Sequence, residues 1–238
     1  MLPLMFDLRT ELAGTIDNRD GSWGFIRRFA AAWSTPLGER DGYDAADLDA
    51  AEQRLGLRLP TVLREAYALL GRRGDLTGNQ DRLLTPEELY IDDTGQVLVY
   101  RLENQHVAEW GIPLDALERE DSRTVYRASM ADKSAELWAP WLDRLSLAFV
   151  EIVLSETLIA EEELFNFLDL TPDDIALVEA TYERLAMPAY PADEPSIVWF
   201  AGPDVLLRQD AGACLMVRAR TPEALDEVYE TLDGEWNL

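Results

Sequence analysis

Few side chains in this sequence could carry out covalent chemistry. A Ser-His or Cys-His site requires a histidine as its base, and His106 is the only histidine among the 238 residues. Cys214 is likewise the only cysteine, so the chain cannot form an internal disulfide. We expect a loop histidine and a buried structural cysteine rather than a catalytic pair. The sequence therefore predicts no catalytic residue and a protein that is not an enzyme.

Paired carboxylates are the other candidates for a site. Asp92-Asp93 and Asp173-Asp174 offer the oxygen ligands that Mg²⁺ and Ca²⁺ prefer, so a metal-dependent hydrolase remains an alternative function. Turn chemistry and helix-start chemistry explain both pairs more simply. Zinc sites draw on several Cys or His ligands, which this chain lacks. The segment 71–78 contains three glycines but neither phosphate-binding glycine motif, so we expect no metal and no cofactor.

The balance of charge restricts the partners. The chain has 21 basic and 46 acidic residues, a formal net charge of −25, which repels nucleic-acid phosphates and anionic membrane surfaces. A basic protein is the partner that complements such a surface. Lys133 is the only lysine, and a GC-rich genome or a salt-adapted proteome explains the acidity equally well. The sequence lacks the patterns of a signal peptide and of a membrane span, so we expect a cytoplasmic protein.

Two short helices joined by a tight corner organise the chain from Tyr43 to Gly71. Asp44 can cap the first helix, Gly56 can take the left-handed conformation that ends it, and Pro60 suits the start of the second. Each helix presents an apolar stripe, formed by Leu48, Ala51 and Leu55 in the first and by Leu63, Ala66, Tyr67 and Leu70 in the second.

A longer motif includes this corner. The pattern AE-x-x-LG-x-x-LP-x-x-L-x-x-x-Y runs from Ala51 to Tyr67, and a glycine-rich loop, the strand 97–102, Asn104-Gln105 and Trp110-Gly111 follow in order. This ordered set resembles the SUKH superfamily, clearly over 44–113 and more weakly over 196–236. The resemblance implies a mixed α+β fold that binds a protein partner. Members most often act as immunity proteins against bacterial toxins, and some regulate cell-wall synthesis in fungi.

Hydrophobic periodicity predicts the remaining elements. The strand 97–102 is expected to be buried on both faces and to pair with 107–112, which would place Trp110 at a sheet edge. We expect helices at 22–33, at 142–159, after Glu161-Glu162-Glu163, from Thr171 and from Thr221, with a short one from Thr85. Further strands are expected at 124–128, 196–200, 205–209 and 214–219.

The partial segregation of helices and strands predicts an α+β protein of SUKH type, with helices packed on a mainly antiparallel sheet. Residues 1–40 would form an N-terminal helical extension, and residues 41–238 would form the SUKH-like domain.

The predicted function is stoichiometric binding of a protein, most simply as an immunity protein that occludes a basic toxin domain such as a nuclease. We expect the acidic face to include Asp92, Asp93, Glu103 and Glu109, which lie near the strands of the SUKH-like motif. Solvated surface acids are the simpler explanation for any one of them. A housekeeping regulator or scaffold of the same fold, bound to an endogenous protein, is the alternative.

Overall fold

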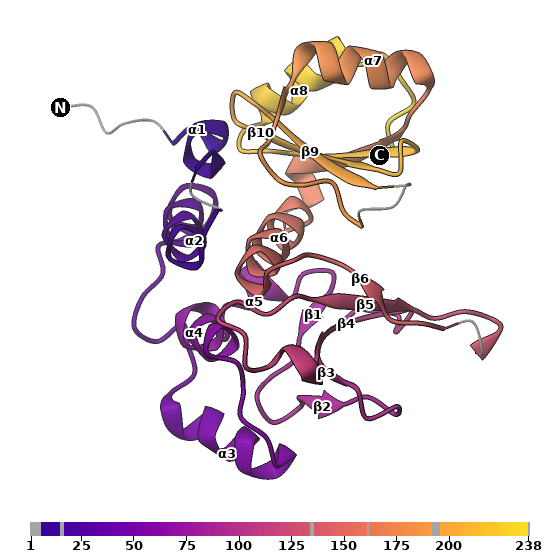
Figure 1. The fold of residues 1–238 in the computed structure, drawn as a ribbon. Helices are drawn as coiled ribbons and strands as arrows, with labels where there is room; N and C mark the ends of the chain where they lie inside the picture. Colours follow the sequence, from indigo (N-terminus) through magenta and orange to yellow (C-terminus); the bar gives the residue numbers. More distant parts are fainter. Residues whose placement is uncertain (1–5, 15–16, 134–135, 161, 192–195, 238) are drawn as a thin grey trace.

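The computed structural model describes residues 6–14, 17–133, 136–160, 162–191 and 196–237. Helices and two antiparallel sheets form an α+β fold (Figure 1), which confirms the predicted fold class. The α-helices are α1 Leu8–Leu12, α2 Arg19–Trp33, α3 Ala45–Leu55, α4 Thr61–Leu70, α5 Gly74–Thr77, α6 Leu145–Leu158, α7 Pro172–Thr181 and α8 Pro222–Thr231. The strands are β1 Arg82–Leu83, β2 Tyr90–Ile91, β3 Val97–Leu102, β4 Ala108–Pro113, β5 Val125–Ala128, β6 Ala139–Pro140, β7 Phe165–Asp169, β8 Glu183–Arg184, β9 Ile197–Gly202, β10 Val205–Asp210 and β11 Cys214–Ala219.

The corner between α3 and α4 forms as its capping residues predict. The side chain of Asp44 accepts the backbone N–H of Asp47 at 3.0 Å, and Gly56 ends α3 in the left-handed region at φ 69°. The Glu52 carboxylate then accepts the N–H of Leu59 at 3.0 Å, which fixes the connection into α4. On α4 the hydroxyl of Tyr67 donates to the carbonyl of Leu84 at 2.6 Å, so the corner is bonded to the connection between β1 and β2.

The first sheet has the strand order β1-β3-β4-β5-β6, with β2 also paired to β3. The predicted hairpin of β3 and β4 is present, and every residue of β3 except Leu102 is buried. Trp110 is not at an edge, because β4 lies between β3 and β5. The prediction for Trp110 was wrong because β5, which is distant in sequence, pairs with β4 and covers the side that would otherwise be the edge.

Helix α6 is the centre of the molecule, as its apolar sequence predicts. All of its residues from Leu145 to Leu158 are buried. Helix α2 packs along it, with the rings of Trp23 and Phe149 at 6.2 Å. Helix α2 begins at Arg19 rather than at Ser22, because the side chain of Asn18 caps it by accepting the N–H of Gly21 at 2.8 Å. The division of the chain at residue 40 stays a prediction.

The second sheet has the order β7-β11-β10-β9-β8, and its predicted meander of β9, β10 and β11 is confirmed. Both of its faces are covered, by α7 and α8 on one side and by the α6 layer on the other (Figure 1). On β10, Leu206 therefore packs into the larger core, whereas Val205 and Leu207 pack under α7 and α8.

Two predicted helices are not helical. After Glu161, which lies outside the described residues, a single 3₁₀ turn at Glu162–Leu164 leads into strand β7. The alternation of β7 and its pairing with β11 override the helical reading of this segment. At Thr85 the chain forms a hydrogen-bonded turn, in which its N–H donates to the Glu88 carboxylate at 2.9 Å, and then enters β2. The turn is followed at once by Tyr90 and Ile91, which pair with β3, so no helix forms here.

Candidate functional site

Arg127 on β5 is the centre of a charged cluster at one end of the first sheet. Its Nη1 lies 2.9 Å from Asp93 Oδ1, and its Nη2 lies 2.9 Å from Glu109 Oε2. The register of β4 and β5 places Glu109 directly opposite Arg127, which explains the second contact. The guanidinium also stacks over the ring of Trp138 at 4.8 Å. The structure thus brings together Asp93 and Glu109, two of the acids predicted to bind a partner.

Asp92, a third predicted acid, is buried beneath this cluster. Its carboxylate accepts hydrogen bonds from Thr94 Oγ1 at 2.6 Å, from Trp138 Nε1 at 3.0 Å and from the N–H groups of Gln96 and Val97 at 2.9 Å. Burial raises its pKa, but these four donors outweigh burial and hold the pKa well below its usual range. At 4% exposure Asp92 holds the β2–β3 turn, which corrects the prediction that it belongs to an exposed acidic face.

The remaining predicted acids differ in how freely they face solvent. The side chain of Asp93 is 80% exposed despite its contact with Arg127. Glu109 is partly buried and also accepts the hydroxyl of Tyr90 at 3.1 Å; burial and the charge of Glu109 raise the pKa of Tyr90. Glu103 stabilises the β3–β4 loop by accepting the N–H groups of Gln105 and Val107 at 2.6 and 3.1 Å. Of these acids, Asp93 is the one best placed to meet a partner.

A polar cavity of about 290 Å³ lies beside the Arg127 cluster, and its lining includes Asp93, Glu109, Lys133 and Glu136. Val107 in this lining is exposed, and so is Leu137, which follows Glu136 in the chain; this feature was not predicted from the sequence. Exposure depends on how β5 and β6 extend from the sheet, which no local pattern reports. The presence of apolar residues in a polar hairpin was the only signal available.

The residues considered for catalysis, His106 and Cys214, lie in different parts of the fold. His106 lies in the β3–β4 loop of the first sheet, at φ 59°, whereas Cys214 begins β11 of the second sheet. Burial, together with the charges of Asp210 and Asp169, raises the pKa of the Cys214 thiol, the opposite of what activates a nucleophile. Asp174 accepts the N–H of Thr171 in a capping box at the start of α7. Within the described residues, no group of three or more His, Cys, Asp or Glu is placed to hold a metal ion.

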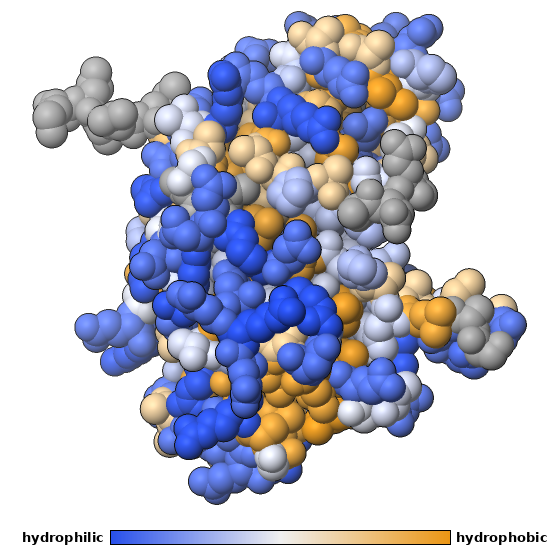
Figure 2. Space-filling view, in the orientation of Figure 1, coloured by the Kyte–Doolittle hydropathy of each residue, from blue (hydrophilic) through white to orange (hydrophobic). Residues whose placement is uncertain are grey.

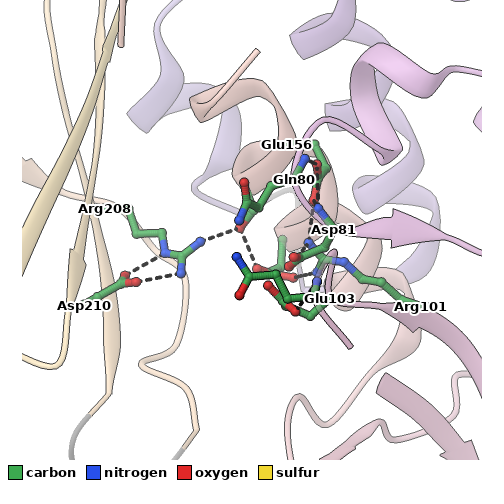
Figure 3. A network of polar contacts seen from close by, with 10 residues as sticks. Gln80, Asp81, Arg101, Glu103, Glu156, Arg208 and Asp210 are labelled. Atoms are coloured by element: carbon green, nitrogen blue, oxygen red, sulfur yellow. Dashed lines mark hydrogen bonds and ion pairs between the residues drawn. The ribbon is translucent and has the colours of Figure 1, made fainter. Parts of the chain in front are cut away.

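A second polar cluster, which sequence reasoning missed, is buried between the two sheets (Figure 3). Arg101 on β3 contacts Glu151 Oε2 at 2.9 Å and Glu156 Oε1 at 2.7 Å, both on α6, and Asp81 Oδ2 at 3.2 Å. A β-bulge positions Arg101: the pairing passes from Val99 with Gly111 to Arg101 with Trp110, so one extra residue re-aims the strand. The signal was present in the sequence, because a charged residue within an apolar strand or helix requires a partner.

The same cluster reaches the second sheet. The hydroxyl of Ser155 donates to Glu151 Oε1 at 2.6 Å, and Arg208 Nη1 lies 3.3 Å from that hydroxyl. Arg208 is itself held by a two-point contact with Asp210 at 2.6 and 2.7 Å. Figure 3 shows Arg208 and Asp210 on one side of this cluster, with Asp81, Arg101 and Glu103 on the other. The arrangement joins β3, α6 and β10, so we interpret it as a structural junction.

Asp81 is the member of this junction whose pKa is raised. Burial raises its pKa to about 6; Arg101 opposes the shift, and the negative charges of Glu156 and Glu151 add to it. Its side chain is 17% exposed, so the carboxyl group can still exchange its proton with solvent.

Comparisons with protein-family models, with curated proteins and with solved structures found no match for this chain. None of the helices in the described part of the chain combines the length and the apolar character needed to cross a membrane. The assignment of function therefore depends on the sequence motif, the charge and the geometry of the first sheet.

Proposed function

We propose that this protein acts by stoichiometric binding of another protein, as a cytoplasmic immunity protein that neutralises a bacterial polymorphic toxin by occluding a basic domain, such as a nuclease groove. The observation that carries the proposal is the acidic end of the first sheet. There the exposed carboxylate of Asp93 stands on a rigid frame formed by Arg127, Trp138 and the buried Asp92. A preorganised surface loses little conformational entropy when it binds.

Charge and sequence resemblance support the same function. A formal net charge of −25 accelerates the approach of a basic partner and disfavours nucleic acid as a direct ligand. The SUKH-like motif covers the α3–α4 corner and the β3–β4 hairpin, and that superfamily is known for binding proteins. We propose binding rather than catalysis because the side chains best suited to covalent chemistry are separated: His106 lies in the β3–β4 loop of the first sheet, and Cys214 begins β11 of the second sheet.

The test is affinity capture of the tagged chain from its own host at low and high salt, followed by mass spectrometry of the bound proteins. The expected result is one stoichiometric basic protein, whose expression alone kills cells and whose killing is relieved by co-expression of this chain. Recovery of a housekeeping or cell-envelope protein without toxicity would instead support a regulator or scaffold. An empty capture at low salt would contradict the proposed function.

A matched pair of variants tests the role of charge. Asp93→Asn and Asp226→Asn remove the same charge, one at the acidic end of the first sheet and one on the exposed face of α8. If the first sheet meets the partner, Asp93→Asn should slow association and flatten its dependence on salt, while Asp226→Asn should have a much smaller effect. Equal on-rates for the two variants at low salt would contradict steering by this face.

A further inference from the structure

Three large apolar side chains are exposed at the acidic end of the first sheet. Leu137 is 75% exposed, Val107 is 50% exposed and Met130 is 47% exposed. Val107 ends the β3–β4 loop, and Met130 and Leu137 lie on the two arms of the β5–β6 hairpin. The backbone connects two of them, because the N–H of Ser129, next to Met130, donates to the carbonyl of Val107 at 2.7 Å. Figure 2 shows apolar surface on this projecting hairpin.

The hairpin is held in place by polar contacts at its base and within it. Trp138 Nε1 donates to Asp92 at 3.0 Å, and Arg127 stacks on the same ring. Further out, the N–H of Met130 donates to Glu136 Oε1 at 2.7 Å. These contacts restrain the described parts of both arms, which lowers the entropic cost of burying the apolar side chains against a partner.

The polar cavity beside these side chains already holds a cation from the chain itself. The ammonium group of Lys133 contacts both Glu136 Oε1 and the hydroxyl of Ser129, the latter at 3.0 Å. The side chain of Lys133 is 71% exposed, so it reaches the cavity from solvent, as a side chain of another protein would. The cavity therefore has the size and the acceptors to bind an ammonium group.

We propose that Leu137, Met130 and Val107 form the apolar anchor of a protein interface, and that the partner is a basic protein. A lysine or arginine of the partner would enter the cavity between Asp93, Glu109 and Glu136. An apolar pocket on the partner, beside that lysine or arginine, would receive Leu137. This inference rests on the proposed function and specifies the surface that performs it. An apolar anchor with a charged rim is the usual composition of an interface whose energy is concentrated in a few residues.

Charge decides between the possible partners of this surface. Around the anchor, acidic residues outnumber basic ones. The acidic residues are Asp93, Glu103, Glu109, Asp132 and Glu136, and the basic residues are Arg127 and Lys133. A second copy of this chain would bring two surfaces of the same sign together in molecules that each carry a net charge of −25. A basic partner gains attraction from the same charges, so we favour it over self-association.

The first test compares Leu137→Ser with the control Leu177→Ser. Leu177 is 40% exposed and lies on α7, one of the helices that pack on the second sheet. The probe is the basic protein recovered by the wild-type chain in the capture described above. Leu137→Ser should lower its recovery at least tenfold at equal unfolding temperature, and Leu177→Ser should leave recovery unchanged. Wild-type recovery by Leu137→Ser would overturn the proposed anchor while leaving the proposed function intact.

The second test concerns the cavity. Lys133→Met removes the ammonium group that contacts Glu136. The partner's own cation should then bind there more readily, and recovery of the basic protein should increase. Unchanged or reduced recovery would contradict the role of the cavity. If the wild-type chain recovers no basic protein at all, the proposed function itself fails, and the anchor fails with it.

Discussion

Arg101 and Glu156 face each other at 2.7 Å, Nη2 to Oε1, in the interior between the two sheets, and neither side chain is more than 2% exposed. One comes from an apolar strand and the other from an apolar helix. The contact forms because the β-bulge in β3 turns Arg101 toward α6. Glu156 is in turn bonded by the N–H of Gln80 at 2.7 Å, so the ion pair also fixes the chain that precedes β1.

Replacing Arg101 should be strongly destabilising. Arg101→Met leaves the carboxylates of Glu151 and Glu156 buried without their counter-ion, and we expect the free energy of unfolding to fall by about 3–5 kcal/mol. Urea denaturation followed by circular dichroism measures the loss. Arg82→Met is the control, because its ion pair with Glu88 is half exposed and should be worth less than about 1 kcal/mol. A similar loss in both variants would contradict the structural role of the junction.

Asp81 should make stability depend on pH in an unusual direction. Its pKa in the folded protein, about 6, lies above the ordinary value of 3.8, so the folded state binds the proton more tightly than the unfolded state. The stabilisation from this proton is complete below pH 3.8 and is lost as the pH rises through 6. Asp81→Asn removes the proton equilibrium with little change of shape. The free energy of unfolding of the wild type, relative to Asp81→Asn, should fall by at most about 3 kcal/mol between pH 4 and pH 7.

The measurement is urea unfolding of both proteins across this pH range. The difference between the curves matters, because other carboxylates titrate in the same range and affect both proteins alike. Curves that stay parallel from pH 4 to pH 7 would show that the Asp81 carboxyl is ionised normally, as it would be if solvent reached the junction.

Local sequence signals predicted the α3–α4 corner and the β3–β4 hairpin. The caps at Asp44 and Gly56 act through neighbouring residues, so they could be identified without tertiary information. Strand β7 and the position of Trp110 could not, because each depends on a strand that is distant in sequence. The α+β class follows from the order of the elements, whereas the arrangement of two sheets around α6 depends on packing.

In the candidate site, too, some features could be predicted from the sequence and others depend on tertiary structure. Asp93 and Glu109 were predicted from charge near the SUKH-like motif, and the structure brings them together through Arg127. The sequence could not show that Asp92 is buried and Asp93 is exposed. Which of the two adjacent side chains points inward depends on the conformation of the β2–β3 turn. The exposed Leu137 was not predicted, since its exposure results from the projection of the β5–β6 hairpin.

Gly42 should not tolerate a side chain. A Cβ atom there would lie 1.8 Å from the carbonyl oxygen of Ala68, which is on α4. Gly42→Ala must therefore push the loop that precedes α3 away from α4. We expect a loss of about 1–3 kcal/mol in the free energy of unfolding, measured by urea denaturation. Gly74→Ala is the control, because nothing lies within 4 Å of its added Cβ, and it should change stability by less than about 1 kcal/mol. Equal effects of the two substitutions would mean that the loop does not pack closely on α4.

The adjacent acids Asp92 and Asp93 should separate stability from binding. Asp92→Ala leaves the Trp138 Nε1 and the N–H groups of Gln96 and Val97 without their acceptor, so we expect a loss of about 2–3 kcal/mol in the free energy of unfolding. Because the pKa of Asp92 is lowered in the folded protein, its stabilisation is present near neutral pH and is lost as the pH falls below 4. Asp93→Ala, with an 80% exposed side chain, should leave stability within about 0.5 kcal/mol. Thermal unfolding at pH 7 and pH 3 measures the first effect, and association kinetics with the captured partner measure the effect of Asp93. If Asp93→Ala destabilised the protein as much as Asp92→Ala, both acids would belong to the turn and neither would remain a candidate for the interface.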